Sequence, residues 1–376
     1  MKKISVYTRD GYDGSSSYYR VLQYTTNMEE FRIQDRITSP KWLTKLMYKA
    51  TNLKFGIGVK LLYYLIIYIT NCFYFMKDLI VKPDCIIVLR SIAPKTFIPP
   101  LTFLYRKLMH SVLVVWDYDD NILESNEISK AEFKILEECS SCIFVTNDEL
   151  ATLIKDKYRG KVSVLHTTDG DFSEISIIEI NNARLKLYDK KIKLVWVGSA
   201  SNLQYLESIL PVLDHTAKKL KSEYKKELEL ICVCNVPINR NCEFLGIKNI
   251  LWTRKAAIKA IIESHIGIMP LDNTKFTKGK GGFKIVQYMA TSLPSVASNV
   301  GFNKEVIKDG VSGFLVDDSI NKDSWSKFII LLAKDKNLWQ KMSNAALERW
   351  KDKFNYCDNY QIWVSTILKL VEVNND

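Results

Sequence analysis

The sequence predicts an α/β protein with two domains, each built around a parallel sheet. Its 376 residues are too many for one ordinary hydrophobic core. With 47% hydrophobic residues, 25% charged residues and no low-complexity segment, the chain should be globular throughout. Short apolar runs such as KISVYT, CIIVLRS and IKLVWVGSA alternate with segments of helical spacing. This alternation favours parallel sheets that are covered by helices on both faces.

One interruption of this alternation indicates a domain border. The pattern becomes polar between residues 173 and 191, and a strand pattern begins again at Ile192. We expect a first Rossmann-like domain at 1–185 and a second at 186–350. From Asp323 onward the pattern is helical, and residues 351–376 are predicted to form a helix that packs back on the first domain.

The parallel arrangement predicts where ligands bind. In open parallel sheets, ligands lie beyond the carboxyl ends of the strands. The candidate regions are therefore the loops that follow the predicted strands: 10–20, 90–96, 117–121, 167–171, 198–203, 270–282 and 299–305.

The net charge indicates which kinds of partner the protein could bind, and the cysteines indicate its compartment. A net charge of +11 suits nucleic acid, a nucleotide-bearing substrate or an anionic membrane, although a lysine-rich, solvated surface gives the same balance. The aromatic residues are scattered and no basic helix stands out, which argues against nucleic acid. Cys139 and Cys142 have the spacing of a zinc or redox pair, but no second pair lies at a ligand distance. Buried thiols in a reducing cytosol are the favoured interpretation.

An apolar stretch, LLYYLIIYITNCFYFM, occupies residues 61–76 between two lysines. Its 16 residues are fewer than the roughly 20 that a membrane-spanning helix needs. It is expected to be either a core helix or a helix lying against lipid. Basic residues nearby predict a peripheral, salt-reversible association with the inner face of a membrane. These residues are Arg32, Arg36, Lys41, Lys45, Lys49 and Lys54.

The stretch TKGKGGFKIVQYMATSLPSVASN, residues 277–299, joins a cationic glycine loop to an apolar helix and a strand. Gly279, Gly281 and Gly282 let the backbone approach a ligand closely. The following helix directs its positive end at the loop, which favours phosphate, and Lys280 and Lys284 add charge. The loop is predicted either to bind a diphosphate or to form a tight turn with solvated lysines.

Two segments of the first domain carry further candidates. Gly14, Ser16 and Ser17 form a glycine-serine loop before a helix, and Arg20 lies in the first turn of that helix. They are expected to contact an acceptor; the alternative is an ordinary capped helix with an exposed arginine. In WDYDDN, residues 116–121, Asp119 or Asp120 could orient an acceptor hydroxyl or take its proton, or could cap the next helix.

The segment GGFKIVQYMATSLPSVASNVGFNKEVIKDGVSGFLV resembles the nucleotide-sugar half of the family 4 glycosyltransferases, in a subgroup with a GKxGFKxxQYMA-type motif. WVGSASNLQYLESILPVL, SSSYYRVLQY and VWDYDDNI are similar to other elements of that subgroup. The resemblance implies the GT-B fold, in which two Rossmann-like domains face a cleft. It also implies a retaining, hexosyltransferase-like enzyme that moves a sugar from a nucleotide diphosphate sugar to a glycan or lipid-linked acceptor.

The resemblance assigns roles to particular residues, and this chain departs from the family at some of them. Two glutamates that contact the donor in typical members are replaced by Gly279 and Gln287. Gln287 is expected to hydrogen-bond a ribose hydroxyl instead. An arginine and a lysine that clamp the diphosphate are absent from VGSASNLQYL. Their place is taken by Gly198, Ser199 and Ser201.

Glu305 matches a further family glutamate before the last glycine loop; its other possible role is that of a carboxylate at a helix N-terminus. We expect catalysis to rest on leaving-group stabilisation by Lys280 and its loop, without a metal or other cofactor. Asp117 and Asp119 have the spacing of the metal-binding carboxylate pair of the GT-A fold.

The sequence therefore predicts a cytoplasmic enzyme of bacterial surface polysaccharide or glycoconjugate assembly, either free or peripherally attached to the inner face of the membrane. The missing glutamates leave an alternative: a catalytically weak GT-B module that binds a sugar nucleotide or glycan within an assembly complex.

Overall fold

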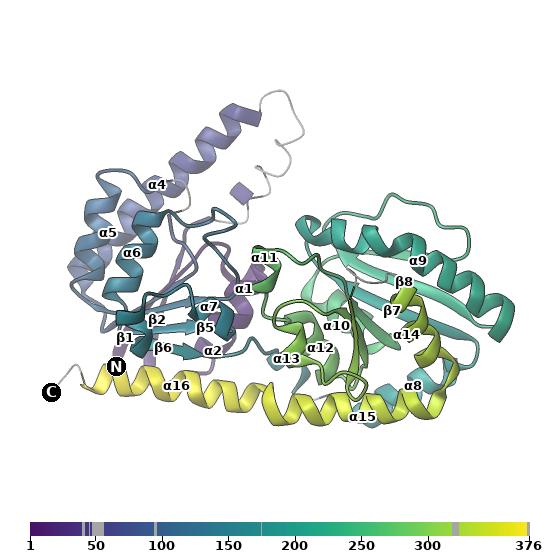
Figure 1. Ribbon diagram of the computed structural model, residues 1–376. Helices are drawn as coiled ribbons and strands as arrows, with labels where there is room; N and C mark the ends of the chain where they lie inside the picture. The colour runs from purple at the N-terminus through teal and green to yellow at the C-terminus, as the bar shows by residue number, and fades with distance from the viewer. Residues whose placement is uncertain are drawn as a thin grey trace. The chain divides into compact units, whose positions relative to one another are not determined.

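The computed structural model describes residues 1–39, 42–44, 46, 56–93, 96–173, 175–317 and 323–373. The chain divides into two compact units (Figure 1). Unit 1 contains Met1–Thr167 and Cys357–Asp376, and unit 2 contains Thr168–Tyr356. Each unit has one six-stranded sheet in which every strand pair is parallel, as the alternation of strands and helices predicts.

The sheet of unit 1 has the strand order β2-β1-β3-β4-β5-β6. Its strands, in chain order, are β1 (Lys2–Thr8), β2 (Phe31–Ile37), β3 (Cys85–Leu89), β4 (Leu113–Tyr118), β5 (Cys142–Val145) and β6 (Val162–Val164). The order reverses between β1 and β3, so their carboxyl ends border the crevice in which such sheets bind ligands. Strand β2 was not predicted, because its sequence FRIQDRI mixes charged and apolar residues at the sheet edge.

The helices of unit 1 cover both faces of its sheet. They are α1 (Ser15–Ser17), the π-helical turn η2 (Tyr18–Leu22), α2 (Gln23–Thr25), α4 (Gly56–Val81), α5 (Leu101–Met109), α6 (Lys130–Cys139), α7 (Asp148–Ala151) and the C-terminal α16 (Tyr356–Val373), with short 3-10 turns at Gly11–Asp13 and Asp156–Lys161. Helix α16 packs on this unit: the ring of Trp363 packs against that of Tyr24 with 5.3 Å between centroids, and Tyr360 donates a hydrogen bond to the Asn27 carbonyl. It begins at Tyr356, whereas residue 351, the expected border, lies inside the preceding helix.

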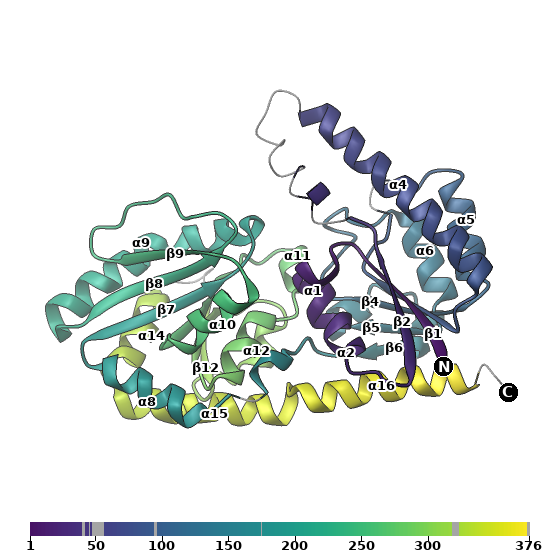
Figure 2. The ribbon, with the colours of Figure 1, turned by 180° about the vertical axis from the view of Figure 1, so that it is seen from behind.

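Helix α4 differs in two respects from what the sequence predicts for its segment, in its length and in its burial. It is 26 residues long, not 16, and by length and composition it could cross a membrane. It is not a core helix either, since only 17% of its most apolar window is buried. Its N-terminal half extends beyond α5 and α6 (Figure 2). Only the side chains that face the sheet, among them Ile67 and Phe75, are fully buried.

The sheet of unit 2 has the strand order β12-β11-β10-β7-β8-β9, which is that of the doubly wound dinucleotide-binding fold. In chain order its strands are β7 (Lys191–Val197), β8 (Glu227–Cys234), β9 (Gly246–Leu251), β10 (Ile266–Met269), β11 (Ser295–Ser298) and β12 (Gly313–Val316). The order reverses between β7 and β10, so the ligand crevice of this sheet lies beyond those two strands.

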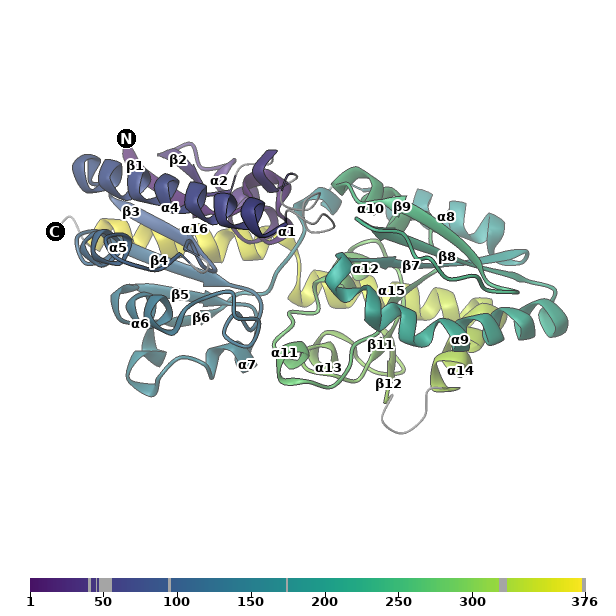
Figure 3. The same ribbon diagram turned by 90° about the horizontal axis from the view of Figure 1, so that it is seen from above.

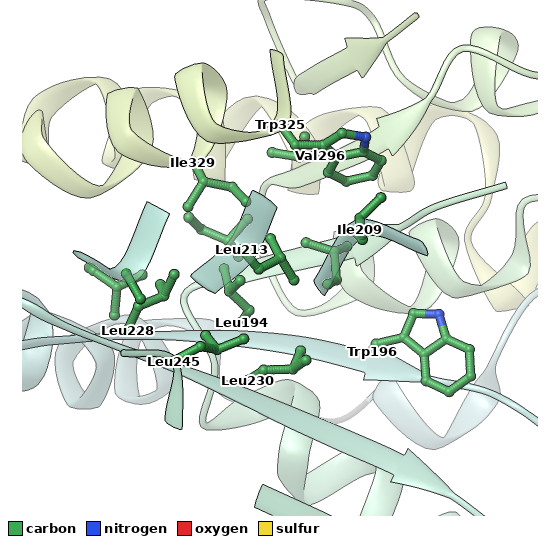
Figure 4. Packing of buried hydrophobic residues seen from close by; sticks show 14 of the residues in the cluster. Leu194, Trp196, Ile209, Leu213, Leu228, Leu230, Leu245, Val296, Trp325 and Ile329 are labelled. Carbon is green, nitrogen blue, oxygen red and sulfur yellow. The ribbon is translucent and has the colours of Figure 1, made fainter. Parts of the chain in front are cut away.

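Helices surround this second sheet, as the view from above shows (Figure 3). They are α8 (Ile177–Tyr188), α9 (Ala200–Tyr224), α10 (Arg254–Ile262), α11 (Lys275–Lys278), α12 (Phe283–Ala290), α13 (Asn303–Val306), α14 (Asp323–Lys334) and α15 (Lys336–Lys353), with a 3-10 turn at Gly170–Phe172. Helix α9 continues through Pro211. Leu213 of α9, Leu194 of β7 and Ile329 of α14 pack together in the core between these layers (Figure 4).

The expected domain border at 185/186 is wrong, because helix α8 belongs to unit 2. Its Arg184 is buried and donates hydrogen bonds to the carbonyls of Ile262 and Thr291, at the ends of α10 and α12. These carbonyls have no partners within their own helices, and the guanidinium satisfies them. Helix α8 was not predicted because its sequence is rich in polar residues. The border lies instead at Thr167/Thr168.

Buried His265 of unit 2 makes stability depend on pH. Its Nδ1 accepts a hydrogen bond from the Lys193 amide and its Nε2 donates one to the Arg184 carbonyl, so the ring is neutral. Burial lowers the pKa of His265 to about 4. As the pH falls from about 6.5 toward 4, the unfolded chain therefore takes up a proton that the folded chain does not.

We predict that lowering the pH from 7 to 5 costs unit 2 roughly 2 kcal/mol of unfolding free energy through His265, at about 1.36 kcal/mol per pH unit below 6.5. Urea unfolding at several pH values measures this loss. His265→Gln should remove this part of the acid sensitivity, whereas His215→Gln, at an exposed histidine, should keep it. Equal acid sensitivity in the two variants would contradict the prediction.

Candidate functional site

In unit 2, the turn after β7 is shaped by an indole ring. A Cβ on Gly198 would lie 2.5 Å from the ring of Trp196, so only glycine fits there. The backbone then enters α9, whose Ala200 amide donates to the side chain of Asn235, after β8. The hydroxyls of Ser199 and Ser201 lie 2.9 Å apart at the exposed start of the helix. This turn presents hydroxyls and the positive end of a 25-residue helix.

The glycine loop after β10 has the predicted arrangement of turn and helix. Gly279 ends α11, and Gly282 adopts a left-handed conformation with φ of 62° directly before α12. Lys280 lies 4.5 Å from the ring centroid of Phe276. Gly281 and Lys284 are partly exposed, and Lys284 is at the first turn of α12.

The two turns meet at Trp196. The Lys284 ammonium lies 5.9 Å from the centroid of the indole over which Gly198 is packed. Both predicted parts of the donor site therefore lie at the carboxyl ends of β7 and β10, where the strand order reverses. An anion there would meet two helix N-termini and the cations of Lys280 and Lys284.

A third loop, after β11, is packed against the glycine loop. A Cβ on Gly301 would lie 2.5 Å from the carbonyl oxygen of Lys278, and one on Gly282 would lie 2.9 Å from Val306. Exposed Glu305 is in the short helix α13, and its carbonyl accepts a hydrogen bond from Arg349. The loop that carries Glu305 thus borders the proposed phosphate loop.

The structure does not support a ribose-binding role for Gln287. Its side chain is buried, and its amide nitrogen donates a 2.7 Å hydrogen bond to the carboxylate of Asp169. Asp169 also accepts a hydrogen bond from the Asp171 amide. Gln287 therefore fixes the segment with which unit 2 begins. The sequence pattern predicted a polar contact, but its partner is a distant part of the chain.

In unit 1, an arginine that the sequence analysis did not single out organises the crevice between β1 and β3. Arg90 follows β3, has a left-handed φ of 54°, and pairs with Asp119, Asp120 and Glu127. Arg9, after β1, pairs with the same Glu127 at 2.8 Å. Such backbone strain in a non-glycine residue is typical of functional sites. An arginine directly after a buried strand was the available sequence signal.

The ion pairs with Arg90 decide how well the predicted catalytic carboxylates, Asp119 and Asp120, could act on an acceptor hydroxyl. Burial acts to raise the pKa of Asp119, but Arg90, with smaller contributions from Arg20 and the Ser16 hydroxyl, brings it below its usual value. A carboxylate with a lowered pKa is a weak general base. Asp120 accepts a 2.7 Å hydrogen bond from the same guanidinium. Asp119 is therefore better suited to orient a hydroxyl than to remove its proton.

The predicted contact between Arg20 and an acceptor is wrong, as is the alternative of an exposed arginine. Arg20 is buried and donates two hydrogen bonds, of 2.8 and 2.9 Å, to the carboxylate of Asp117. Burial raises the pKa of Asp117 to about 6, against the opposing charge of Arg20. Asp117 and Asp119 are thus each held by an arginine, which does not suit the GT-A metal pair.

The rest of the serine loop lies at the same strand ends. Gly14 accepts a hydrogen bond from the Tyr18 amide at the start of the helix, and a Cβ there would lie 2.9 Å from Asp10. Ser17 is buried, whereas Ser16 is partly exposed and hydrogen-bonds Asp119. Of the predicted acceptor contacts, Ser16 is therefore the one that interacts directly with a carboxylate paired with Arg90.

Among the described residues, no group of three or more histidine, cysteine, aspartate or glutamate side chains could hold a metal ion. Cys139 lies 3.6 Å from His110, and Cys142 is a buried free thiol. A cavity of about 730 Å³ lies elsewhere in unit 2, between α8 and α15, beside Trp339 and Trp350. It contains none of the predicted site residues.

Comparison with known proteins identifies the class to which this architecture belongs. Residues 178–349, somewhat less than half of the chain, match the family described as "Glycosyl transferases group 1". In solved structures, the chain is similar to HepE of Anabaena in complex with UDP-glucose, with a TM-score of 0.66 and 11% identity over 98% of this chain and 100% of that one. Sucrose-phosphate synthase from Thermosynechococcus elongatus has a TM-score of 0.64 and 10% identity over 99% and 100%. The chain has the GT-B fold.

Curated relatives match over shorter segments. Sucrose synthase 5 of Arabidopsis thaliana is 30% identical over 92 residues, which are 24% of this chain and 10% of that protein. Sucrose synthase of Melioribacter roseus is 30% identical over 78 residues, 20% of this chain and 10% of its own. The matched segment spans about a tenth of the length of these relatives.

Gly301 and Gly310 offer a matched test of the loop packing. Both have positive φ, 52° and 70°, but a Cβ on Gly310 would meet nothing within 4 Å. Gly310→Ala should cost about 1–2 kcal/mol of unfolding free energy through its backbone alone. Gly301→Ala should cost a further 1–3 kcal/mol or so, because the new methyl group meets the Lys278 backbone. Urea unfolding measures both, and equal losses would show that the contact does not constrain the loop.

Proposed function

We propose that the protein is a retaining glycosyltransferase that moves a hexose from a nucleotide diphosphate sugar to a glycan or lipid-linked acceptor. Its proposed setting is bacterial surface polysaccharide or glycoconjugate assembly in the cytoplasm. The cytoplasmic setting is supported by the eight cysteines, all of them free thiols. The UDP-glucose in the structure of HepE makes UDP sugars the first donors to test.

One observation carries the donor assignment: in unit 2, the turns of Gly198 and Gly282 converge on Trp196, at the point where the strand order reverses. A nucleotide diphosphate placed there would have its phosphates at the start of α9 and α12. Lys280 and Lys284 would neutralise the charge that builds on the diphosphate as the glycosidic bond breaks. Glu305 and the hydroxyls of Ser199 and Ser201 would contact the rest of the donor.

On the acceptor side, we assign Ser16 and the carboxylates held by Arg90. Ser16 and Asp119 are hydrogen-bonded, and Asp120 is fixed by the same guanidinium. A hydroxyl nucleophile would be oriented by these groups. Because Arg90 lowers the pKa of Asp119, deprotonation by this carboxylate would contribute little.

The second candidate is a GT-B module that binds a sugar nucleotide without efficient turnover. It is favoured by the departures from the family pattern at two positions. Gly279 has no side chain, and Gln287 is buried against Asp169, so neither supplies a carboxylate to a donor. Weak hexosyl transfer with normal nucleotide binding would follow.

Incubation with UDP, GDP and ADP sugars, with nucleotide release measured both without and with excess EDTA, tests the proposal. Our prediction is turnover with at least one donor, unchanged by the chelator, because helix ends and lysines can stabilise the leaving group without a metal. Binding without release would support the second candidate. Turnover that EDTA abolishes and manganese restores would contradict the metal-independent mechanism.

Lys280→Ala and Lys284→Ala should each weaken donor binding by about 1.5–3 kcal/mol, because each removes a charged hydrogen bond to phosphate. Calorimetry with UDP measures the effect. Lys221→Ala is the matched control, since Lys221 is exposed near the other end of α9, about 30 Å along the helix from the turn. Unchanged affinity in both site variants would reject the diphosphate site, whatever the activity.

A further inference from the structure

Helix α4 exposes an apolar face along its whole length. The exposed large side chains of this face recur every three or four residues, so they lie on one side of the helix, over an arc of about 160°. The residues of this apolar face are Ile57, Leu61, Leu62, Leu65, Ile69, Phe73, Met76 and Ile80. A contiguous apolar surface of this length marks an interaction site rather than ordinary surface.

The surface around the apolar face carries further apolar side chains and lysines. Phe103 of α5 and Ile98 before it are also exposed, and the Tyr68 hydroxyl of α4 donates to the Pro99 carbonyl beside them. Lys60 and Lys77 are exposed on α4 itself. The one acidic residue of this helix, Asp78, is buried. The exposed part of α4 is therefore apolar and cationic, with no exposed carboxylate.

The opposite side of α4 is fixed to unit 1 by polar contacts. The Asn71 amide donates to the Ile92 carbonyl at 2.9 Å. The Asp78 carboxylate accepts hydrogen bonds from Arg36 and from the Tyr7 hydroxyl. These buried contacts hold the C-terminal part of the helix against the sheet. The part before Asn71 is only about 21–23 Å long, less than the roughly 30 Å of a bilayer core.

We propose that the apolar face of α4 lies in the surface of an anionic lipid bilayer, parallel to its plane, without crossing it. An interfacial helix of this kind buries its apolar side among the acyl chains and keeps its lysines at the headgroups. Tyr64, partly buried at the edge of this face, has the amphipathic ring typical of the headgroup region. The absence of exposed carboxylates on α4 fits anionic lipid better than a protein partner of mixed charge.

This surface differs from the basic face that the sequence predicted. Of the six basic residues of that predicted face, Arg36 is buried in its pair with Asp78 and Arg32 is exposed. The other four lie outside the described residues: Lys41, Lys45, Lys49 and Lys54. Attraction by exposed charge is screened by salt, whereas burial of apolar surface is not. Binding should therefore persist at high salt, contrary to the salt-reversible association that the sequence predicted.

The test is flotation of the full chain with vesicles of phosphatidylcholine and phosphatidylglycerol, at low and at high salt. We expect flotation under both conditions, with a partial decrease at high salt. Leu61→Glu and Leu65→Glu should each reduce vesicle binding at least about tenfold, since each places a charge in the apolar region. Leu251→Glu is the matched control, because Leu251 is 71% exposed in unit 2 and Leu61 is 67% exposed.

Several outcomes would overturn the proposal. They are no flotation at low salt, complete release at high salt, or equal losses in Leu61→Glu and Leu251→Glu. Dimerisation without vesicles that Leu61→Glu abolishes would assign the face to a second copy of the chain instead. Vesicle binding needs neither donor nor acceptor, so its failure is distinguishable from failure of the proposed glycosyl transfer.

Discussion

Every strand pair in both sheets is parallel, and this constraint places all the chemistry of each unit at one edge of its sheet. In unit 2, the turns after β7, β10 and β11 share that edge. They fit together because glycines leave room where a side chain would clash: Gly198 lies over the indole ring of Trp196, and Gly301 lies against the backbone of Lys278. The donor loops are thus shaped by close packing and not only by their sequence.

The cationic side chains of the protein fall into two groups. Some stabilise the fold, and others lie where a ligand can reach them. Arg20, Arg36 and Arg184 are buried and hold carboxylates or helix-end carbonyls. A guanidinium suits such positions because its planar donors satisfy several acceptors at once. The exposed or partly exposed cations at the proposed donor loops are lysines, whose flexible ammonium groups can follow a phosphate. Arg90 has features of both groups, since it fixes two carboxylates but does so at the ligand crevice of unit 1.

The two proposals address different surfaces of the molecule. The donor site is a feature of unit 2 alone, and the apolar face of α4 is a feature of unit 1 alone. If both hold, the enzyme meets an acceptor at the bilayer surface while its donor comes from the aqueous phase. Lipid-linked acceptors would then be favoured over soluble glycans, because binding to the bilayer raises their local concentration.

The sequence by itself determined the fold class and the position of the glycine loop. Apolar strands such as β3 and β10 and the helix after Gly282 were predictable, because burial on both faces and glycine geometry are local properties of the chain. Strand β2, strand β9 and helix α8 were not, since their mixed sequences become ordered only against their neighbours. The tertiary structure alone decided that Arg20 and Gln287 face inward and that the apolar side of α4 faces outward. Which partner a side chain meets depends on residues about 100 positions away, and no local pattern contains that information.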